Sequence, residues 1–417
     1  MKFIHAADLH LDSPLRGLAR YDSAPVEEIR GASRRALKKL IQLAIDECVR
    51  FVIFSGDVFD GDWKDYNTGL FFASQMSRLK QEGVKVFIAA GNHDAVSPIS
   101  RSLKMPDNVH TFSSRSFESI GLDDIGVVLH GRSFPGREVK EDWVPSFPKP
   151  VKGAFNIGVL HTSVGGYTEH MTYAPCSLGS LINKGYDYWA LGHVHASEIL
   201  NRSPWVVFPG NIQGRHVRET GAKGCMLVSV NDNEVIDALL CELDVLRWYN
   251  LVIKAHREDD EDALIGKFKD KLNEIINGAG GRIAAVRVTI TGSCVAHEAF
   301  MKDPEKWRNE LRATSIDEGR GEIWLEKIQF TTDSTIHQAP SGLIQELMGH
   351  IRKLSEDDDT LLNSGKEALK RLQEKLPSEL TTGEEALSLD DPTWLRKTLL
   401  EGMEQLNVSM TGSRGGR

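Results

Sequence analysis

The sequence predicts an α/β protein in which two β-sheets pack face to face with helices outside them, followed by a small α+β domain and a helical C-terminal region. Three observations support this prediction. Short apolar runs of strand length, each followed by Gly, Asp, Asn or His, recur through about the first 245 residues. Helix-like and strand-like patterns alternate early in this part, and the pattern changes near Arg247.

The first part begins with alternating strands and helices. Its strand-length runs are Phe3–Ala7, Phe51–Ser55, Val84–Ala90, Ile125–His130, Phe155–Leu160 and Tyr186–Leu191. Apolar residues within Val26–Arg50 recur at i, i+3 and i+4, which predicts an amphipathic helix. A second helix is expected from about Tyr66 to Glu82, stopping at Gly83. Strands separated by helices pair in parallel through crossovers, and the strand-rich stretch that follows, including Trp205–Phe208 and Cys225–Val230, predicts the second sheet.

The remainder divides into two further regions. Strands and helices in the order βαβαβ are expected at Arg247–Ala255, Asp260–Asn277, Arg282–Thr291, Pro304–Thr314 and Glu322–Thr331. We therefore predict domains at residues 1–245 and 246–335 and a helical region at 336–417. Apolar stripes mark that last region: Leu343, Ile344, Leu347, Ile351 and Leu354, then Trp394, Leu395, Leu399, Leu400, Met403 and Leu406. These stripes could pack on the chain's own domains or bind a partner, and the pattern favours neither.

Composition excludes several classes of protein. No window reaches about 18 unbroken apolar residues, so no membrane helix is expected. The five cysteines are scattered without a CxxC pair, which argues against a disulfide framework or a thiolate zinc site and favours a cytoplasmic location. The net charge of −9 argues mildly against coating nucleic acid by bulk electrostatics.

Clusters of potential metal ligands follow five of the apolar runs. They are Asp8-Leu-His10, Gly56-Asp57-Val-Phe-Asp60, Gly91-Asn92-His93-Asp94, His161 and Gly192-His193-Val-His195. Ligands in α/β folds gather where strands end and loops begin. On extended backbone, residues i and i+2 point to the same side, so the Asp8/His10 and His193/His195 pairs should each face one point.

The chemistry of these clusters predicts two divalent metal ions. Each cluster alone could be turn chemistry, a core histidine or chance, but five in order after strands indicate one site. Carboxylate, imidazole and amide ligands without thiolate suit manganese, iron or zinc. The candidate ligands are too many for one ion and fit two ions with a bridging carboxylate, the arrangement used for displacement at phosphorus. They are Asp8, His10, Asp57, Asn92, His161, His193 and His195.

These clusters, in this order, resemble the calcineurin-like metallophosphoesterases over the first 245 residues or so. Four longer segments resemble the bacterial DNA-repair exonucleases of the SbcD and YhaO type. They are Phe3-Ile-His-Ala-Ala-Asp-Leu-His-Leu-Asp12, Phe54-Ser-Gly-Asp-Val-Phe-Asp60, Asp187-Tyr-Trp-Ala-Leu-Gly-His-Val-His195 and Phe208-Pro-Gly-Asn-Ile-Gln-Gly-Arg215. The resemblance implies a two-sheet αββα sandwich, a small capping domain and a helical partner-binding tail.

The resemblance also implies roles for single residues. Asp8, His10 and His195 would hold the first ion, Asp57 would bridge both, and Asn92, His161 and His193 would complete the second site. His93 would face the phosphate as general acid or transition-state stabiliser, oriented by Asp94. Asp60 stands where the archaeal and eukaryotic branch carries a histidine, so the role of that histidine is not transferred. His216, near a loop rim, is a weaker candidate for touching substrate.

The expected function is therefore a manganese-dependent DNA nuclease, a 3′→5′ exonuclease and single-strand endonuclease in DNA repair; magnesium, iron or zinc could replace manganese. An SbcC-like coiled-coil ATPase is the expected partner, and a homodimer is possible. The sequence contains no GxxxxGK[ST] motif, so ATP hydrolysis would need another subunit. Two alternatives remain: a phosphatase or cyclic-nucleotide phosphodiesterase on a small substrate, and a catalytically latent DNA-end-binding subunit.

Overall fold

The computed structural model describes residues 1–13, 25–60, 65–97, 103–165, 173–319, 321–335, 391–400 and 402, with scattered positions between 346 and 369. The described residues form two compact units, each considered by itself. The first lies within Met1–Leu15, Pro25–Tyr249 and Gly281–Ala285, and the second contains Asn250–Gly280 and residues from Val286 onward.

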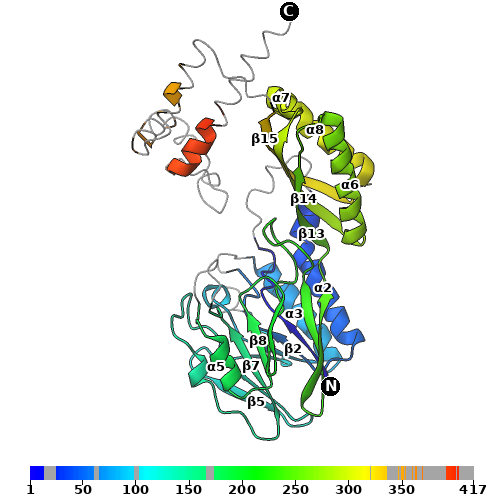
Figure 1. Ribbon diagram of the computed structural model, residues 1–417. Coiled ribbons are helices and arrows are strands. Elements are labelled where there is room, and N and C mark those ends of the chain that lie inside the picture. Colours follow the sequence, from blue (N-terminus) through cyan, green and yellow to red (C-terminus); the bar gives the residue numbers. More distant parts are fainter. Residues whose placement is uncertain are drawn as a thin grey trace, which may run out of the picture. The chain divides into compact units, whose positions relative to one another are not determined.

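The first unit contains two sheets (Figure 1). One has the strand order β12-β11-β1-β2-β3-β4. Its strands are β1 (Lys2–Ala6), β2 (Phe51–Phe54), β3 (Lys85–Ile88), β4 (Val109–Thr111), β11 (Gly224–Asn231) and β12 (Glu234–Glu242). The strands β1 to β4 pair in parallel, as the alternation of strands and helices predicted, whereas β11 pairs antiparallel with β1 and β12.

The other sheet has the order β5-β6-β7-β8-β10-β9. Its strands are β5 (Glu118–Leu122), β6 (Val127–Gly131), β7 (Phe155–His161), β8 (Tyr188–Gly192), β9 (Glu198–Arg202) and β10 (Trp205–Phe208). The middle strands β6, β7, β8 and β10 are parallel, and β5 and β9 close the edges antiparallel. Parallel strands end at one edge of a sheet, so the loops after β7 and β8 lie together.

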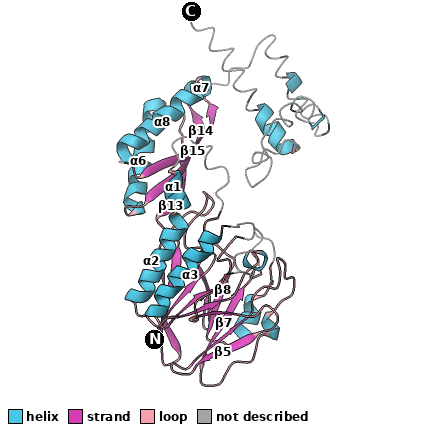
Figure 2. Cartoon of the chain, turned by 180° about the vertical axis from the view of Figure 1, so that it is seen from behind, coloured by secondary structure: helices cyan, strands magenta, loops and turns pink. Residues whose placement is uncertain are grey.

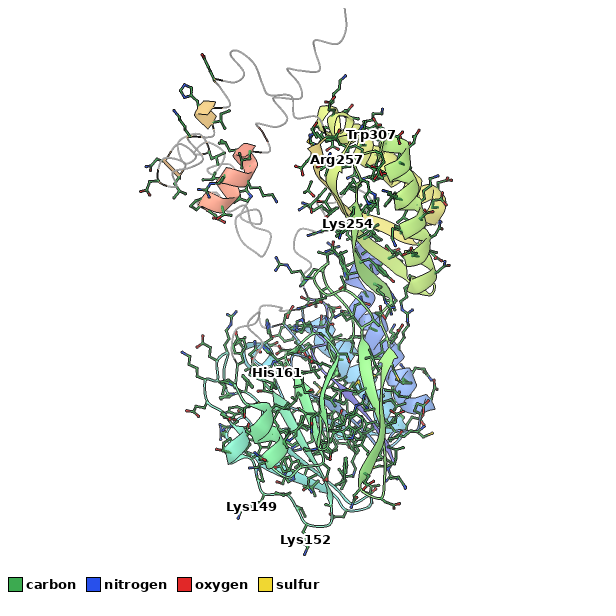
Figure 3. All side chains as sticks on the ribbon, in the orientation of Figure 1. Lys149, Lys152, His161, Lys254, Arg257 and Trp307 are labelled. Carbon is green, nitrogen blue, oxygen red and sulfur yellow. The ribbon has the colours of Figure 1, made fainter. Side chains whose placement is uncertain are left out.

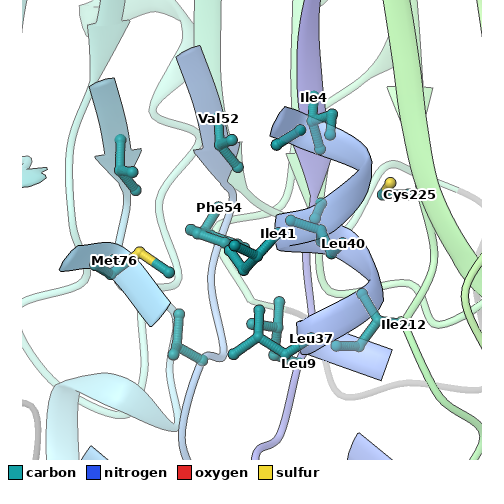
Figure 4. Packing of buried hydrophobic residues seen from close by; sticks show 14 of the residues in the cluster. Ile4, Leu9, Leu37, Leu40, Ile41, Val52, Phe54, Met76, Ile212 and Cys225 are labelled. Carbon is teal, nitrogen blue, oxygen red and sulfur yellow. The ribbon is translucent and has the colours of Figure 1, made fainter. Parts of the chain in front are cut away.

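Apolar side chains fill the space between the sheets and cover both outer faces. Phe3 and Phe51 of the first sheet and Phe155 of the second belong to the central core. The helices α2 (Ala32–Asp46) and α3 (Tyr66–Gln81) lie side by side on the outer face of the first sheet (Figure 2). Figure 4 shows Leu37 and Ile41 of α2 packed among the side chains of these strands. The helix α5 (Leu178–Asn183) and the short helix η3 (Val144–Ser146) cover the second sheet. This confirms the predicted two-sheet sandwich.

The first predicted helix differs in detail from the structure. A single helix was expected over Val26–Arg50, but α1 (Val26–Arg30) ends before Gly31, and α2 begins at Ala32 after it. The helical region also ends earlier than the expected Arg50. The helix α2 stops at Asp46, and Cys48 adopts a left-handed φ of 49°. Periodicity marked the buried face correctly but carried no information on these two breaks.

The second unit is built around the sheet β13-β14-β15. Its elements are β13 (Leu246–Lys254), α6 (Glu261–Ala279), β14 (Ile283–Cys294), α7 (His297–Lys302), α8 (Pro304–Gly319) and β15 (Ile323–Ser334). The expected order is therefore found, with α7 added. The boundaries 1–245, 246–335 and 336–417 stay predictions, since β13 and β14 each have residues in both units.

Little of the C-terminal region is described. Of the predicted stripes, Leu343, Ile344, Leu347, Leu354, Met403 and Leu406 lie outside the described residues. Residues 392–400 are helical, and Leu395 within them is buried. Among the helices that the structure describes, none combines the length and apolar character needed to cross a membrane.

Candidate metal centre

The five clusters predicted from the sequence all follow the carboxyl ends of strands. The first three come after β1, β2 and β3 of one sheet, and the last two come at the ends of β7 and β8 of the other. Figure 3 shows His161, at the end of β7, inside the first unit, whereas Lys149 and Lys152, which precede β7, lie at the lower edge of that unit. The sandwich thus brings loops from both sheets to one place.

The loops reach the site through left-handed turns. Asp8, His10 and Asp57 have φ values of 51°, 41° and 51°. Main-chain hydrogen bonds join the two loops: Asp8 N donates to Gly56 O and His10 N to Asp57 O, each at 3.0 Å. The prediction of extended backbone at Asp8 and His10 was therefore wrong, although both side chains do meet. It also fails for the other pair, because His193 has a φ of 104° and faces a different set of side chains from His195.

Asp8, His10 and His195 form a set that we call the first ligand group. One ligand atom from each lies within 4.8 Å of the others. The Nε2 atoms of the two imidazoles are 3.3 Å apart and converge on one point. Asp8 is 1% exposed and His10 is 2% exposed, whereas the side chain of His195 is 20% exposed, so this group reaches solvent at His195.

Asp57, Asn92, His161 and His193 form the second ligand group. His161 Nε2 lies 3.4 Å from Asp57 Oδ2 and 3.0 Å from Asn92 Oδ1. The rings of His161 and His193 are 5.3 Å apart, and the main-chain N–H of His193 donates to the Asp8 carboxylate. Asp57 Oδ2 also lies 4.0 Å from His10 Nε2, so this oxygen stands between the two groups.

Glycines permit this close packing at two positions where no side chain would fit. A Cβ on Gly56, whose φ is +105°, would lie 2.1 Å from His161 Nδ1. A Cβ on Gly91 would lie 2.3 Å from Asp57 Oδ1. Both glycines therefore act by close approach of the main chain to the site.

His93 is the accessible imidazole of the site. Its side chain is 40% exposed, and its main-chain N–H donates to Asp57 Oδ1 at 3.0 Å. Asp94 was expected to orient it, but the Asp94 carboxylate accepts main-chain N–H groups from Val58, Phe59 and Gly91. The carboxylate near His93 is that of Asp60, with Oδ1 3.5 Å from His93 Nδ1 and 2.6 Å from His10 Nδ1.

Two residues that contact the site were not predicted from the sequence. Arg215 and Glu219 lie on the loop after β10, and Glu219 Oε1 is 2.7 Å from His195 Nδ1. His216, on the same loop, has Nε2 3.6 Å from Glu219 Oε1 and a side chain 43% exposed. Arg215 closes a segment that carried the family resemblance, but no spacing rule linked Glu219 to a ligand.

Burial and charge act on the titratable groups of the site in opposite directions. Burial raises the pKa of Asp8 to about 6. Burial opposes ionisation of Asp57 as well, but the charges of His161, His10 and His93 hold its pKa well below the usual range. Burial likewise disfavours protonated His161, but Asp57 and Asp8 outweigh it and raise the pKa of His161 to about 9. Without a cation, Asp57 and protonated His161 form an ion pair.

The residues present fit two divalent cations. Two carboxylates lie buried beside four imidazoles and an amide oxygen, with no cysteine among them. Buried carboxylates need a compensating positive charge, and this mixture of nitrogen and oxygen donors suits divalent ions of intermediate hardness. A cation at the second group would replace the proton on His161, as metal ligands must be deprotonated.

Comparison with known proteins identifies the family. The profile of the calcineurin-like phosphoesterases matches residues 1–197, and that of the YhaO middle domain matches residues 248–333. The metallophosphoesterase YhaO of Bacillus subtilis is 30% identical over 341 residues, which is 80% of this chain and 82% of the relative. The chain belongs to the calcineurin-like metallophosphoesterases.

Other relatives of this metallophosphoesterase are DNA double-strand break repair proteins named Mre11. That of Methanopyrus kandleri is 27% identical over 63% of this chain and 61% of its own length, and that of Sulfolobus acidocaldarius is 25% identical over 47% and 50%. As a metallophosphoesterase the chain is a hydrolase of phosphate ester bonds, and its family uses a centre of two divalent cations.

Proposed function

We propose that this metallophosphoesterase is a manganese-dependent DNA nuclease, a 3′→5′ exonuclease and single-strand endonuclease that acts in DNA repair. The observation that carries the proposal is the convergence of the two ligand groups around Asp57 Oδ2, next to an accessible His93. The similarity to the Mre11 repair proteins supports DNA as the substrate.

The chain's own residues supply binding, orientation and proton transfer. Two bound cations would polarise the phosphate and activate water for an in-line displacement. The first and second ligand groups would hold these cations, with the oxygen of Asp57 shared between them. Because His93 Nδ1 faces Asp60, a doubly protonated His93 would donate its proton from Nε2 to the leaving 3′ oxygen.

The donor set supports manganese as the native metal. Imidazole nitrogens with carboxylate and amide oxygens suit manganese, while the number of imidazoles disfavours magnesium, and iron or zinc would also bind. We further propose that the protein acts in the cytoplasm with an SbcC-like coiled-coil ATPase and that it can form a homodimer. The helical segment at 392–400 belongs to the region proposed to bind that ATPase.

Nuclease activity can be tested with defined DNA substrates. Purified full-length protein, alone and with the ATPase, is incubated with DNA labelled at either end, with and without Mn²⁺. We expect Mn²⁺-dependent cleavage whose products shorten from the 3′ end. His93→Gln should lower kcat by about a hundredfold while the bound metal is retained. His110→Gln, which changes another histidine of similar exposure (39%), should leave cleavage unchanged.

The same assay separates the alternatives. Faster turnover of a nucleoside monophosphate or a cyclic nucleotide than of DNA would replace the nuclease proposal with a small-substrate phosphatase or phosphodiesterase. Full DNA-repair function of His93→Gln in cells would favour a catalytically latent DNA-end-binding subunit.

A further inference from the structure

The two imidazoles of the first ligand group are each backed by a carboxylate. His10 Nδ1 lies 2.6 Å from Asp60 Oδ1, and His195 Nδ1 lies 2.7 Å from Glu219 Oε1. An ionised carboxylate can only accept hydrogen bonds, so both Nδ1 atoms must carry the proton. Both Nε2 atoms then present lone pairs, and these are the atoms that converge at 3.3 Å.

Glu219 is fixed by contacts to both of its oxygens. Oε2 accepts from the main-chain N–H of Arg215 and from Asn211 Nδ2, each at 2.8 Å. Oε1 accepts from Arg215 Nη2 at 3.0 Å as well as from His195. The residue is 6% exposed, so its carboxylate has little freedom to turn away from His195.

Because of the neighbouring Arg215, the residue at position 219 decides which nitrogen of His195 carries the proton. Arg215 Nη2 lies 3.2 Å from His195 Nδ1 and can only donate a hydrogen bond. If Glu219 did not hold the proton on Nδ1, Arg215 could donate to Nδ1 instead, and the proton would move to Nε2. A protonated Nε2 has no lone pair for a cation, so this tautomer would remove a ligand.

Asp60 contacts a second functional imidazole. Its Oδ1, which faces His10, is also 3.5 Å from His93 Nδ1. The side chain is 12% exposed and lies between a residue of the first ligand group and the accessible imidazole. A substitution of Asp60 should therefore affect both cation binding and the chemical step, whereas a substitution of Glu219 should affect cation binding alone.

We propose that Asp60 and Glu219 are positioning residues that hold His10 and His195 in the cation-binding tautomer, and that Asp60 also positions His93. This inference rests on the proposed metal centre. Partners of this kind change metal affinity by about 10- to 100-fold when mutated. A purely structural role for Glu219 would instead be to brace the loop from Asn211 to Arg215, which its Oε2 contacts also permit.

The experiment compares four full-length proteins prepared without metal: wild type, Glu219→Gln, Asp60→Asn and Asn211→Ala. Asn211→Ala is the matched control, because it removes a contact to Oε2 and leaves Oε1 on His195. Titration calorimetry gives the affinity and stoichiometry for Mn²⁺. The visible absorption spectrum of the Co²⁺-loaded protein reports ligand geometry. Melting temperatures of the metal-free proteins report folding.

We expect Glu219→Gln to weaken binding of the cation at the first ligand group by about 10- to 100-fold and to change the Co²⁺ spectrum. With saturating Mn²⁺ its kcat should return close to that of wild type. Asp60→Asn should show the same loss of affinity and also a lower kcat at saturating Mn²⁺. Asn211→Ala should bind Mn²⁺ as wild type does, even if its metal-free melting temperature falls.

Two results would overturn the inference. Wild-type affinity and spectrum in Glu219→Gln would show that His195 does not depend on this carboxylate. Equal losses in Glu219→Gln and Asn211→Ala would assign Glu219 to bracing the loop. Failure of the proposed metal centre is a distinct outcome, since wild type itself would then bind no Mn²⁺.

Discussion

The two ligand groups of this metallophosphoesterase are held by different kinds of atoms. In the first group, the imidazoles of His10 and His195 have side-chain carboxylates at Nδ1. In the second group, His161 Nδ1 donates to the main-chain carbonyl of Ser55 at 3.0 Å. That carbonyl belongs to the loop directly after β2, which parallel pairing with β1 and β3 holds in place.

This difference shows that one metal centre can contain imidazoles oriented by side chains and an imidazole oriented by the main chain. Orientation of the first group depends on Asp60 and Glu219, which single substitutions can change. Orientation of His161 depends on the main-chain carbonyl of Ser55, which a substitution of the Ser55 side chain leaves in place. We therefore expect the first cation to vary more in affinity among variants of this protein than the second.

The largest effect is expected from Asp57→Ala, because Asp57 Oδ2 lies near ligands of both groups. Cation binding should fall at both positions, and DNA hydrolysis should drop by about a thousandfold, equivalent to about 4 kcal/mol of transition-state stabilisation. Metal content and cleavage rate measure the two effects. His195→Ala is the comparison, since it should spare the cation of the second group. Unimpaired metal content in Asp57→Ala would refute a shared oxygen.

A smaller effect is expected on the stability of the metal-free protein when the pH is raised. It arises in the second ligand group. Asp57 and Asp8 overcome burial and raise the pKa of His161 from 6.5 to about 9. A raised histidine pKa gives stability that is fully present below pH 6.5 and lost as the pH rises through about 9. The loss should be about 3 kcal/mol, measured as a falling urea midpoint.

His161→Gln should flatten this pH dependence, and Mn²⁺ should reverse it, because cations compete better with protons at higher pH. A metal-free wild type whose urea midpoint is constant from pH 6.5 to 9 would contradict the ion pair between Asp57 and His161.

The smallest effect is expected from Ser55→Ala, which tests the main-chain contact directly. The substitution keeps the carbonyl that binds His161 and removes a hydroxyl that contacts His5 Nε2 at 2.9 Å. The free energy of unfolding should fall by about 1 kcal/mol, while Mn²⁺ affinity should stay within about twofold of wild type, well short of the loss expected at a positioning side chain. A loss of affinity like that of Glu219→Gln would remove the distinction between the two groups.

Sequence reasoning predicted the layers, the parallel strands and the meeting place of the loops, because periodicity and strand ends are local properties. It placed Asp8, His10, Asp57 and His161 at one site for the same reason. It assigned Asp94 as the partner of His93, whereas the structure places the Asp60 carboxylate there; both residues are close in sequence to ligands, and only the fold decides between them. It missed Glu219 because a residue that acts through another carries no motif of its own.

The left-handed backbone at Asp8, His10 and Asp57 has a consequence for how this protein can change over generations. Residues other than glycine hold such conformations at a cost of about 1–3 kcal/mol each. Replacing one of them by glycine would relieve that backbone strain but remove the metal-ligating side chain. The variant with the less strained backbone would therefore be the inactive one. Selection for folding stability alone would therefore favour loss of these ligands. Where the ligands are retained in descendants of this protein, selection for the reaction must have kept them.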